Sequence, residues 1–526
     1  MSRTVYSGTT ASPGTALGVA FRTDRPHAQT LPHRRLDDPV GQITEAFDAV
    51  TRRMRELAES LRAQGQSEQA DIMEVAGHIA ADNDLRALAI GNAEQGSPTT
   101  VAIKRAVDSY ATMLASLDDP MLAERATDVR QIGRRALAWL HGDDDNDVDG
   151  PLVLLAHEIG AADLLEPHAP VVAAASVVGG PNSHASIVAR SLGIPLLLGI
   201  DEAALRCPDG VEVLVDAQRA ALVVTPDAEE RQTALTTMES ARTRKAKLVA
   251  ERDLPSVTRG GRRIVLRANI ATPSDAQAAL TARAEGVGLL RTELPFLDAR
   301  SWPSYAQHTA ALVPVFRRLA HQPVTVRTLD FADDKLPPFL AGEGGRIGRG
   351  LPLMLAEPDA FADQFRAILT AGAATDLRIM IPMVASADEL AVCRDLLAKA
   401  AVDVGVAPPP LGAMIELPEA VADIDSIAAA ADFLSIGSND LTCQVLGLDR
   451  RDPAATPAMA AHPDVQAAIG EVVTAAHRRQ LLVSVCGDAA ADAEVIPLLV
   501  ALGCDILSVA PSAVDEVRAH IRQLAD

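Results

Sequence analysis

The feature that most constrains the fold is a series of eight short apolar segments, regularly spaced between residue 257 and the end of the chain. Helix-forming stretches separate most of them. Eight strand–helix units in about 270 residues predict a (β/α)8 barrel, whose parallel strands close into an inner cylinder. The predicted strands are IVLRANI (264–270), GVGLLRT (286–292), VTVRTLD (324–330), LRIMIPM (377–383), LGAMIEL (411–417), FLSIGSND (433–440), LLVSVCGD (481–488) and DILSVAP (505–511).

Polar residues stand at the carboxyl ends of at least five of these strands. A (β/α)8 barrel carries its active site on that rim, so these side chains are expected to converge there. Arginines suit a phosphate or a carboxylate, because the planar guanidinium matches two oxygens. Any single charge of this kind could equally form a loop salt bridge, but the whole set favours an active site. The set is Arg291, Thr292 and Glu293; Arg327, Thr328 and Asp330; Glu416; Asn439 and Asp440; and Cys486, Gly487 and Asp488.

Three of these positions point to particular chemistry. Glu416 and Asp440 follow neighbouring strands and could hold Mg²⁺, which binds a few carboxylates together with substrate phosphate and water. Cys486 could be an apolar filler, the usual role of a free cysteine. Its place at the rim also allows it to act as a proton donor.

The amino-terminal half has a different character. Residues 1–25 read as short extended pieces around a turn, and residues 41–142 read as helical. The apolar residues of the first helical segment alternate spacings of four and three, which predicts an amphipathic helix with a narrow buried face. Those residues are Ile43, Phe47, Val50, Met54, Leu57 and Leu61. Residues 151–226 alternate apolar runs with Gly and Pro turns, which predicts a compact mixed α/β unit.

The segment GGPNSHASIVARSLGIP (179–195) carries a second functional signal. Asn182 or Ser183 can cap a helix that begins near His184. The free N–H groups of a helix start favour a phosphate, and a neutral imidazole is a good nucleophile toward a phosphoryl group. A lone histidine at a helix start is also often an ordinary surface residue, so spacing alone leaves both readings open.

Taken in order, the motifs resemble enzyme I of the bacterial sugar phosphotransferase system, the phosphoenolpyruvate–protein phosphotransferase. The resemblance covers nearly the whole chain. The segments that carry it are SGTTASPGTALG, ERATDVRQIGRR, GGPNSHASIVARSLGIP, ANIATPSDA, AEGVGLLRTE, VRTLD, LRIMIPM, MIELPEA, SIGSNDLT with Asp449 and Arg450 after it, and CGD. This ordered set is far more specific than any one motif.

The resemblance implies a multidomain α/β fold. A mixed α/β phosphohistidine domain (1–29 and 143–226) would hold an inserted helical bundle (30–142). A linker helix (227–256) would lead to a C-terminal (β/α)8 barrel (257–526) that binds phosphoenolpyruvate. The helical bundle would dock a small histidine-containing phosphocarrier protein in sugar uptake, and the family's barrel implies a homodimer.

The resemblance also implies residue roles. His184 would carry the phosphoryl group, and Cys486 would protonate the enolate carbon as pyruvate forms. Glu416 and Asp440 would bind Mg²⁺. The residues that would hold phosphoenolpyruvate are Arg291, Arg327, Asn439, Asp440 and Arg450.

Several positions depart from the family pattern. Asn182 stands where Thr is usual, and Asp488 stands where Glu is usual. Residues 332–335 read ADDK in place of Gly-Gly-Asp-Lys. The segment GEGGRIGRGLP (342–352) lacks the usual Asn-Pro, and Arg349 matches the family arginine only with a shifted spacing. These departures leave a regulatory paralogue with weakened activity as an alternative.

A nucleotide-using relative, such as phosphoenolpyruvate synthase or pyruvate phosphate dikinase, is a further alternative. Those enzymes need a large ATP-binding domain. The roughly 150 residues before GGPNSH are mostly helical and contain no Walker-type phosphate loop, which argues against this reading.

Composition excludes other classes of function. The net charge of −22 argues against nucleic acid as a partner, because its phosphates would be repelled. No secretory signal is visible, and no apolar run reaches the ~18 residues of a membrane span. The five cysteines are odd in number and widely spaced, which predicts reduced thiols in the cytoplasm.

Overall fold

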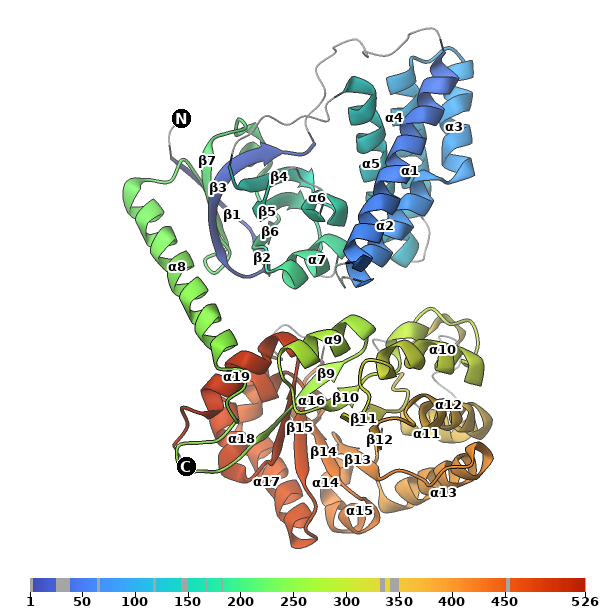
Figure 1. Ribbon diagram of the computed structural model, residues 1–526, viewed down its shortest axis with the longest axis vertical. Helices are drawn as coiled ribbons and strands as arrows, with labels where there is room; N and C mark the ends of the chain where they lie inside the picture. Colours follow the sequence, from blue (N-terminus) through green and yellow to red (C-terminus); the bar gives the residue numbers. More distant parts are fainter. Residues whose placement is uncertain are drawn as a thin grey trace. The chain divides into compact units, whose positions relative to one another are not determined.

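The computed structural model describes residues 3–24, 38–63, 67–116, 120–142, 150–165, 169–180, 183–331, 336–340, 350–450 and 455–525 (Figure 1). The chain forms two compact units, residues 1–244 and 245–526. The division falls inside the long helix α8 (Ala228–Ala250). Several sequence predictions lie outside the described residues, namely those on Asn182, on 332–335, on Arg349 and on the domain boundaries at 30 and 143.

The second unit contains the predicted barrel. Its eight strands are hydrogen-bonded in parallel around a closed ring, in the order β10-β11-β12-β13-β14-β15-β16-β9. The strands are β9 (Val265–Ile270), β10 (Val287–Leu290), β11 (Pro323–Arg327), β12 (Asp376–Ile381), β13 (Leu411–Ile415), β14 (Leu434–Gly437), β15 (Val483–Cys486) and β16 (Ile506–Val509). Each coincides with one of the eight predicted segments, so the barrel prediction is confirmed.

Helices surround this ring and cover its outer face. They are α9 (Pro273–Thr281), α10 (Tyr305–Phe316), α11 (Leu351–Ala356), α12 (Pro358–Ala371), α13 (Ala387–Val404), α14 (Pro418–Ala422), α15 (Ile424–Ala430), α16 (Ser438–Leu446), α17 (Pro463–Arg478), α18 (Ile496–Leu502) and α19 (Val514–Ile521). Side chains alternate along each strand, so Leu411, Ala413 and Ile415 of β13 join the large core beneath the helices. Met414 points the other way, into a small cluster with Leu289, Met380, Phe433 and Cys486. This alternation directs the polar strand-end residues inward at the rim.

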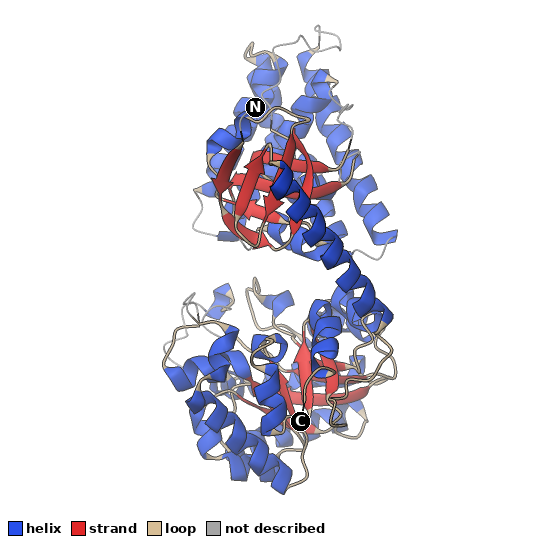
Figure 2. Cartoon of the chain, turned by 90° about the vertical axis from the view of Figure 1, so that its left-hand side faces the viewer, coloured by secondary structure: helices blue, strands red, loops and turns tan. Residues whose placement is uncertain are grey.

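The first unit contains a mixed eight-stranded sheet, drawn in red in Figure 2. Strands β3 to β6 pair in parallel, and antiparallel strands complete both sides in the order β1-β8-β7-β3-β4-β5-β6-β2. The strands are β1 (Thr4–Ser7), β2 (Thr9–Ser12), β3 (Thr15–Arg22), β4 (Leu152–Glu158), β5 (Val171–Val178), β6 (Leu196–Leu198), β7 (Glu212–Asp216) and β8 (Ala221–Val224). The first residues of the chain therefore share one sheet with residues 152–224.

The described residues between β3 and β4 form five helices: α1 (Pro39–Ala63), α2 (Ser67–Ala80), α3 (Asn83–Glu94), α4 (Thr99–Ala115) and α5 (Pro120–His141). The predicted buried face of α1 is confirmed, although Leu57 is only partly buried. One apolar core joins these helices to β4 and to the short helices α6 (Ala161–Leu165) and α7 (His184–Leu192). The finer division of this unit into domains stays a prediction.

Within the described part of the chain, we find no helix that combines the length and the apolar character needed to cross a bilayer.

Candidate active site

His184 is the first residue of α7, and the sequence around it builds a well-defined helix start. Ser183 is the N-cap residue, and its hydroxyl accepts a hydrogen bond from the Ser186 N–H at 3.3 Å. The buried Ser186 hydroxyl donates to the Gly180 carbonyl at 2.8 Å, which ties the glycine turn to the helix. The helix ends at Gly193, whose φ of 68° suits glycine. The His184 side chain is 30% exposed and so can be reached from solvent.

Asp128 of α5 faces this histidine. Its Oδ2 atom lies 3.7 Å from Nδ1 of His184, and the Asp128 side chain is 17% exposed. Helix α5 is held against this region by further contacts, because Arg134 and Arg135 both pair with Asp163 of α6, whose side chain is largely buried. A carboxylate near Nδ1 favours a proton on that nitrogen and leaves Nε2 with its lone pair. Asp128 was not predicted from the sequence, because its partner lies 56 residues further along the chain.

We expect Asp128→Asn to slow phosphorylation of His184 by about tenfold, the equivalent of roughly 1.4 kcal/mol of lost orientation and charge. The phosphate should also become less selective between Nδ1 and Nε2, which phosphorus NMR of the phosphorylated chain can resolve. Asp71→Asn, on the exposed side of α2, is the matched control. An unchanged rate and an unchanged ratio of the two isomers would show that Asp128 does not position the histidine.

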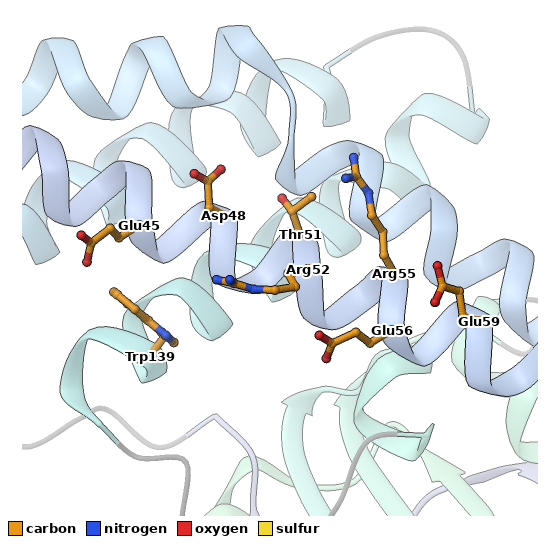
Figure 3. A pocket seen from close by; sticks show the side chains of 8 residues that line it. All are labelled: Glu45, Asp48, Thr51, Arg52, Arg55, Glu56, Glu59 and Trp139. Carbon is orange, nitrogen blue, oxygen red and sulfur yellow. The ribbon is translucent and has the colours of Figure 1, made fainter.

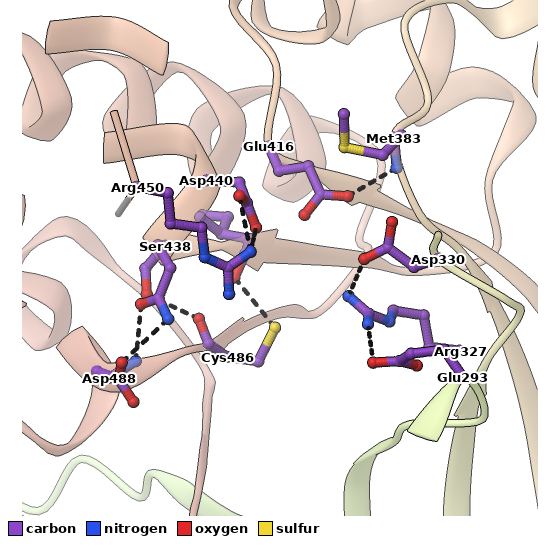
Figure 4. Close-up of polar contacts among 12 residues, drawn as sticks. Glu293, Arg327, Asp330, Met383, Glu416, Ser438, Asp440, Arg450, Cys486 and Asp488 are labelled. Carbon is purple, nitrogen blue, oxygen red and sulfur yellow. Dashed lines mark hydrogen bonds and ion pairs between the residues drawn. The ribbon is translucent and has the colours of Figure 1, made fainter. Parts of the chain in front are cut away.

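Arg327, at the end of β11, is held by two buried carboxylates (Figure 4). Its Nη2 donates to Glu293 at 2.8 Å, and its Nη1 lies 2.8 Å from Asp330. Burial alone would lower the pKa of Arg327, but Asp330 and Glu293 raise it overall, so the guanidinium stays charged. Its Nε atom is buried and has no hydrogen-bond partner among the described residues. That donor is available to an anion entering the barrel.

Glu416 directly follows β13 and is 1% exposed. The Met383 N–H donates to its Oε1 at 2.6 Å. Burial, together with the charges of Asp330 and Asp440, raises the pKa of Glu416 to about 8. A side chain at Gly437 would collide with Glu416, because a Cβ there would lie 2.6 Å from Oε2. The end of β14 therefore needs a glycine to make room for this carboxylate.

Asp440 lies in the first turn of α16, and Arg450 follows that helix after a short loop. Nη1 of Arg450 lies 2.9 and 2.8 Å from the two carboxylate oxygens of Asp440. Asp440 is 26% exposed and Arg450 is 36% exposed, so this pair faces the open side of the site.

Cys486 ends β15 and is 3% exposed, inside the barrel. Burial raises the pKa of its thiol to about 11, so the thiol keeps its proton at neutral pH. The buried Ser435 hydroxyl of β14 donates to Sγ at 3.7 Å, and Sγ lies 3.5 Å from the Ile436 carbonyl oxygen. Cys486 also interacts electrostatically with Glu416, Arg327 and Asp440, which places the thiol among the charged residues of the rim.

The segment after Cys486 fixes Asn439. The Asn439 side-chain NH2 donates to Asp488 at 3.1 Å, and the Asp488 N–H donates back to Asn439 Oδ1 at 2.9 Å. Gly487 between them has a φ of 102°, and a Cβ there would lie 2.4 Å from the Ser438 hydroxyl. The Cys-Gly-Asp sequence thus requires its glycine for this turn.

Most of the predicted rim residues meet in one place, because Arg327, Glu416, Asp440 and Cys486 are linked by electrostatic interactions. Arg291 follows β10, and its Nε is buried with no hydrogen-bond partner among the described residues. Within the described residues, no hydrogen bond or ion pair joins the Arg291 side chain to the others. The roles of all these rim residues in ligand binding remain predictions. Ser435 was not predicted as a site residue. It stands two residues before Gly437 on β14 and therefore shares its face of the strand, so the strand pattern would have placed Ser435 inside the barrel.

The residues fit a divalent cation that is completed by substrate. No three His, Cys, Asp or Glu residues within the described ranges form a metal-binding group by themselves. Glu416 and Asp440 supply two carboxylates that interact electrostatically. Mg²⁺ commonly takes one or two protein carboxylates and completes its octahedron with phosphate oxygens and water, so this donor set fits.

The first unit also has a polar pocket of about 680 Å³ along α1 (Figure 3). Residues of α1, among them Arg52, Arg55 and Glu56, form one side, and Trp139 of α5 forms the other. Among the described residues, its lining includes no histidine or cysteine and so offers neither a phosphate-accepting imidazole nor a thiol.

Most of the chain matches models of known protein families. Three models of PEP-utilising enzymes match: the N-terminal model over residues 7–125, the mobile domain over 148–220 and the PEP-binding domain over 245–526. The last of these alone covers more than half of the chain.

The curated relatives align with 98% of this chain. A multiphosphoryl transfer protein of Xanthomonas campestris is 34% identical, and the chain spans 63% of its length. The phosphoenolpyruvate-dependent phosphotransferase system protein of Escherichia coli is 31% identical, with 71% of its length covered. The phosphoenolpyruvate-protein phosphotransferase of Geobacillus stearothermophilus is also 31% identical, with 93% of its length covered.

The barrel, its charged rim and the three matched domains define a PEP-utilising enzyme. Within that class, the chain belongs to the phosphoenolpyruvate-protein phosphotransferase family, as the sequence resemblance predicted.

Proposed function

We propose that the chain transfers the phosphoryl group of phosphoenolpyruvate to His184, releases pyruvate, and passes the group to a histidine of a small phosphocarrier protein in sugar uptake. The main support is the rim of the barrel, where Arg327, Glu416 and Asp440 surround the protonated thiol of Cys486. Phosphoenolpyruvate carries a phosphate, a carboxylate and a carbon that must be protonated, and this set serves all three. The helical bundle would dock the carrier, and the family resemblance supports a homodimer in the cytoplasm.

The reaction divides between the two units. In the barrel, Arg291, Arg327 and Arg450 would bind the phosphate and carboxylate, with Asn439 as a further donor. Mg²⁺ held by Glu416 and Asp440 would supply charge neutralisation for the phosphate. The bond between phosphorus and the enol oxygen breaks as a bond to a nitrogen of His184 forms, and the electron pair stays on the enolate.

The enolate carbon then takes the proton of Cys486. A thiol whose pKa is raised to about 11 holds that proton at neutral pH and can give it to a strongly basic carbon. The thiolate that remains would accept a hydrogen bond from Ser435, which lies 3.7 Å from Sγ. Solvent can return the proton after pyruvate leaves.

Incubation with phosphoenolpyruvate, Mg²⁺ and labelled pyruvate tests the proposal. We expect exchange of label between pyruvate and phosphoenolpyruvate, transfer of phosphate to a histidine-containing carrier, and no labelling from ATP. Labelling from ATP would support the nucleotide-using alternative. The absence of exchange in a folded protein would support the regulatory paralogue.

The metal site has its own prediction, which follows from Glu416. Because the pKa of Glu416 is raised to about 8, the folded, metal-free chain keeps a proton that the unfolded chain loses above a pH of about 4.5. Folded stability without metal should therefore fall as pH rises from about 4.5 to 8. The affinity for Mn²⁺ or Mg²⁺ should increase as pH rises through the same window. Binding should release up to about one proton, because either metal needs Glu416 in its deprotonated form.

Calorimetry of Mn²⁺ binding in buffers of different ionisation enthalpy measures the released proton. Glu416→Gln together with Asp440→Asn should abolish metal binding and metal-dependent activity. Glu419→Gln, an exposed carboxylate on α14, is the matched control and should change neither. Retained activity in the double variant would place the metal elsewhere.

A further inference from the structure

Arg450 occupies an unusual position for a residue expected to bind substrate. Its Nη1 lies 2.9 and 2.8 Å from the two carboxylate oxygens of Asp440, the same group that is expected to bind the metal (Figure 4). A guanidinium so placed supplies the positive charge that a divalent cation would otherwise supply. The Asp440 carboxylate is thus neutralised from within the chain.

Two of the rim arginines, Arg327 and Arg450, are held in different ways. Arg327 is 7% exposed and is bound by Glu293 and Asp330, neither of which is expected to bind metal. Arg450 is 36% exposed, lies beyond the end of α16 and is bound through Asp440. Arg327 is therefore held by groups outside the expected metal site, whereas the contact between Arg450 and Asp440 uses a carboxylate that another cation can claim.

A metal ion and Arg450 compete for Asp440. Mg²⁺ binds carboxylate oxygen at about 2.0–2.1 Å, and at that distance its double charge repels a guanidinium on the same carboxylate. Glu416, the other expected ligand, is buried and accepts a hydrogen bond from the Met383 N–H, so Asp440 is the carboxylate that the exposed guanidinium contacts.

We propose that Arg450 is the built-in counter-cation of the metal-free site, and that metal binding at Asp440 releases Arg450 to hold the phosphate of phosphoenolpyruvate. This inference rests on the proposed function. Its consequence is positive coupling, because the metal creates part of the substrate site, and by linkage the substrate must tighten metal binding by the same factor. A coupling of about 5–150-fold is typical of such paired sites.

The test uses the His184→Ala background, in which phosphoenolpyruvate can bind without being consumed. Affinities for Mn²⁺ and for phosphoenolpyruvate are measured by calorimetry, each with and without the other ligand. Arg450→Gln should bind Mn²⁺ alone about 5–10-fold more tightly than the parent, since its competitor is gone. It should lose phosphoenolpyruvate affinity mainly when Mn²⁺ is present, so that the coupling shrinks toward onefold.

Two further variants make the result decisive. Arg479→Gln removes the same charge from an exposed position after α17 and should leave all four affinities unchanged. Arg450→Lys keeps the charge without the planar guanidinium. Its affinities for Mn²⁺ and phosphoenolpyruvate should lie between those of the parent and of Arg450→Gln.

The proposal is overturned if Arg450→Gln weakens phosphoenolpyruvate binding equally with and without Mn²⁺, because Arg450 would then bind substrate independently of the metal. It is also overturned if the affinity for Mn²⁺ alone is unchanged. A failure of the proposed function looks different: Mn²⁺ affinity would be insensitive to Glu416→Gln, or phosphoenolpyruvate would not bind the parent.

Discussion

Replacing His184 with alanine is expected to abolish phosphorylation of the chain while leaving its affinity for phosphoenolpyruvate within about twofold of the parent. The reason is that His184 starts α7 in the first unit, whereas Arg327, Glu416 and Asp440 lie at the rim of the barrel in the second. The substitution removes the imidazole that would accept the phosphoryl group and touches none of the groups that would hold the ligand. Calorimetry with phosphoenolpyruvate and Mg²⁺ gives the affinity, and labelled phosphoenolpyruvate reports phosphorylation.

His157→Ala is the matched control, because that side chain is exposed on β4 in the same unit. The control should be phosphorylated like the parent. If His184→Ala instead loses phosphoenolpyruvate binding together with phosphorylation, the separation of ligand site and acceptor between the two units is wrong.

Cys486→Ala is expected to slow pyruvate formation by about 10²–10⁴-fold, the usual contribution of general acid catalysis. Phosphoryl transfer needs no proton from the thiol, so His184 should still be phosphorylated in a single turnover. The enolpyruvate released would then gain its proton from water. In deuterated water, with substrate labelled at C3, the methyl group of pyruvate should lose its facial selectivity, and chiral-methyl analysis measures that loss.

A structural role for Cys486 predicts a different outcome. The residue packs with Leu289, Met380 and Met414, so a smaller side chain would lower the melting temperature without changing the stereochemistry. Cys504→Ala removes another fully buried thiol from the barrel unit and controls for that effect. Retained selectivity in a folded Cys486→Ala protein would point to Asp488 or a bound water as the proton source.

The sequence patterns predicted the barrel well, because each strand is a local apolar run with its own turn signals. Those patterns also placed Arg327, Glu416 and Cys486 on one rim, since parallel strands of a barrel bring their carboxyl ends together. The fold class therefore follows from local apolar patterns. The meeting of the site residues on one rim follows from the parallel arrangement of the barrel strands.

The partners of these residues could not be predicted in the same way. Asp128 faces His184 across 56 residues of sequence, and their approach depends on how α5 packs against α7. The pairing of Arg450 with Asp440 depends on the path of the loop after α16. Such contacts are set by tertiary packing, for which the sequence carries no local periodic signal.

The proposed function requires that a phosphoryl group from phosphoenolpyruvate comes to rest on His184. The most direct measurement is peptide mapping by mass spectrometry at alkaline pH, where phosphohistidine survives, after brief incubation with phosphoenolpyruvate and Mg²⁺. We expect a single phosphate on the peptide that contains His184, absent when Mg²⁺ is removed and lost again when pyruvate is added in excess. A phosphate on any other residue, or no phosphate on a folded chain, would contradict it.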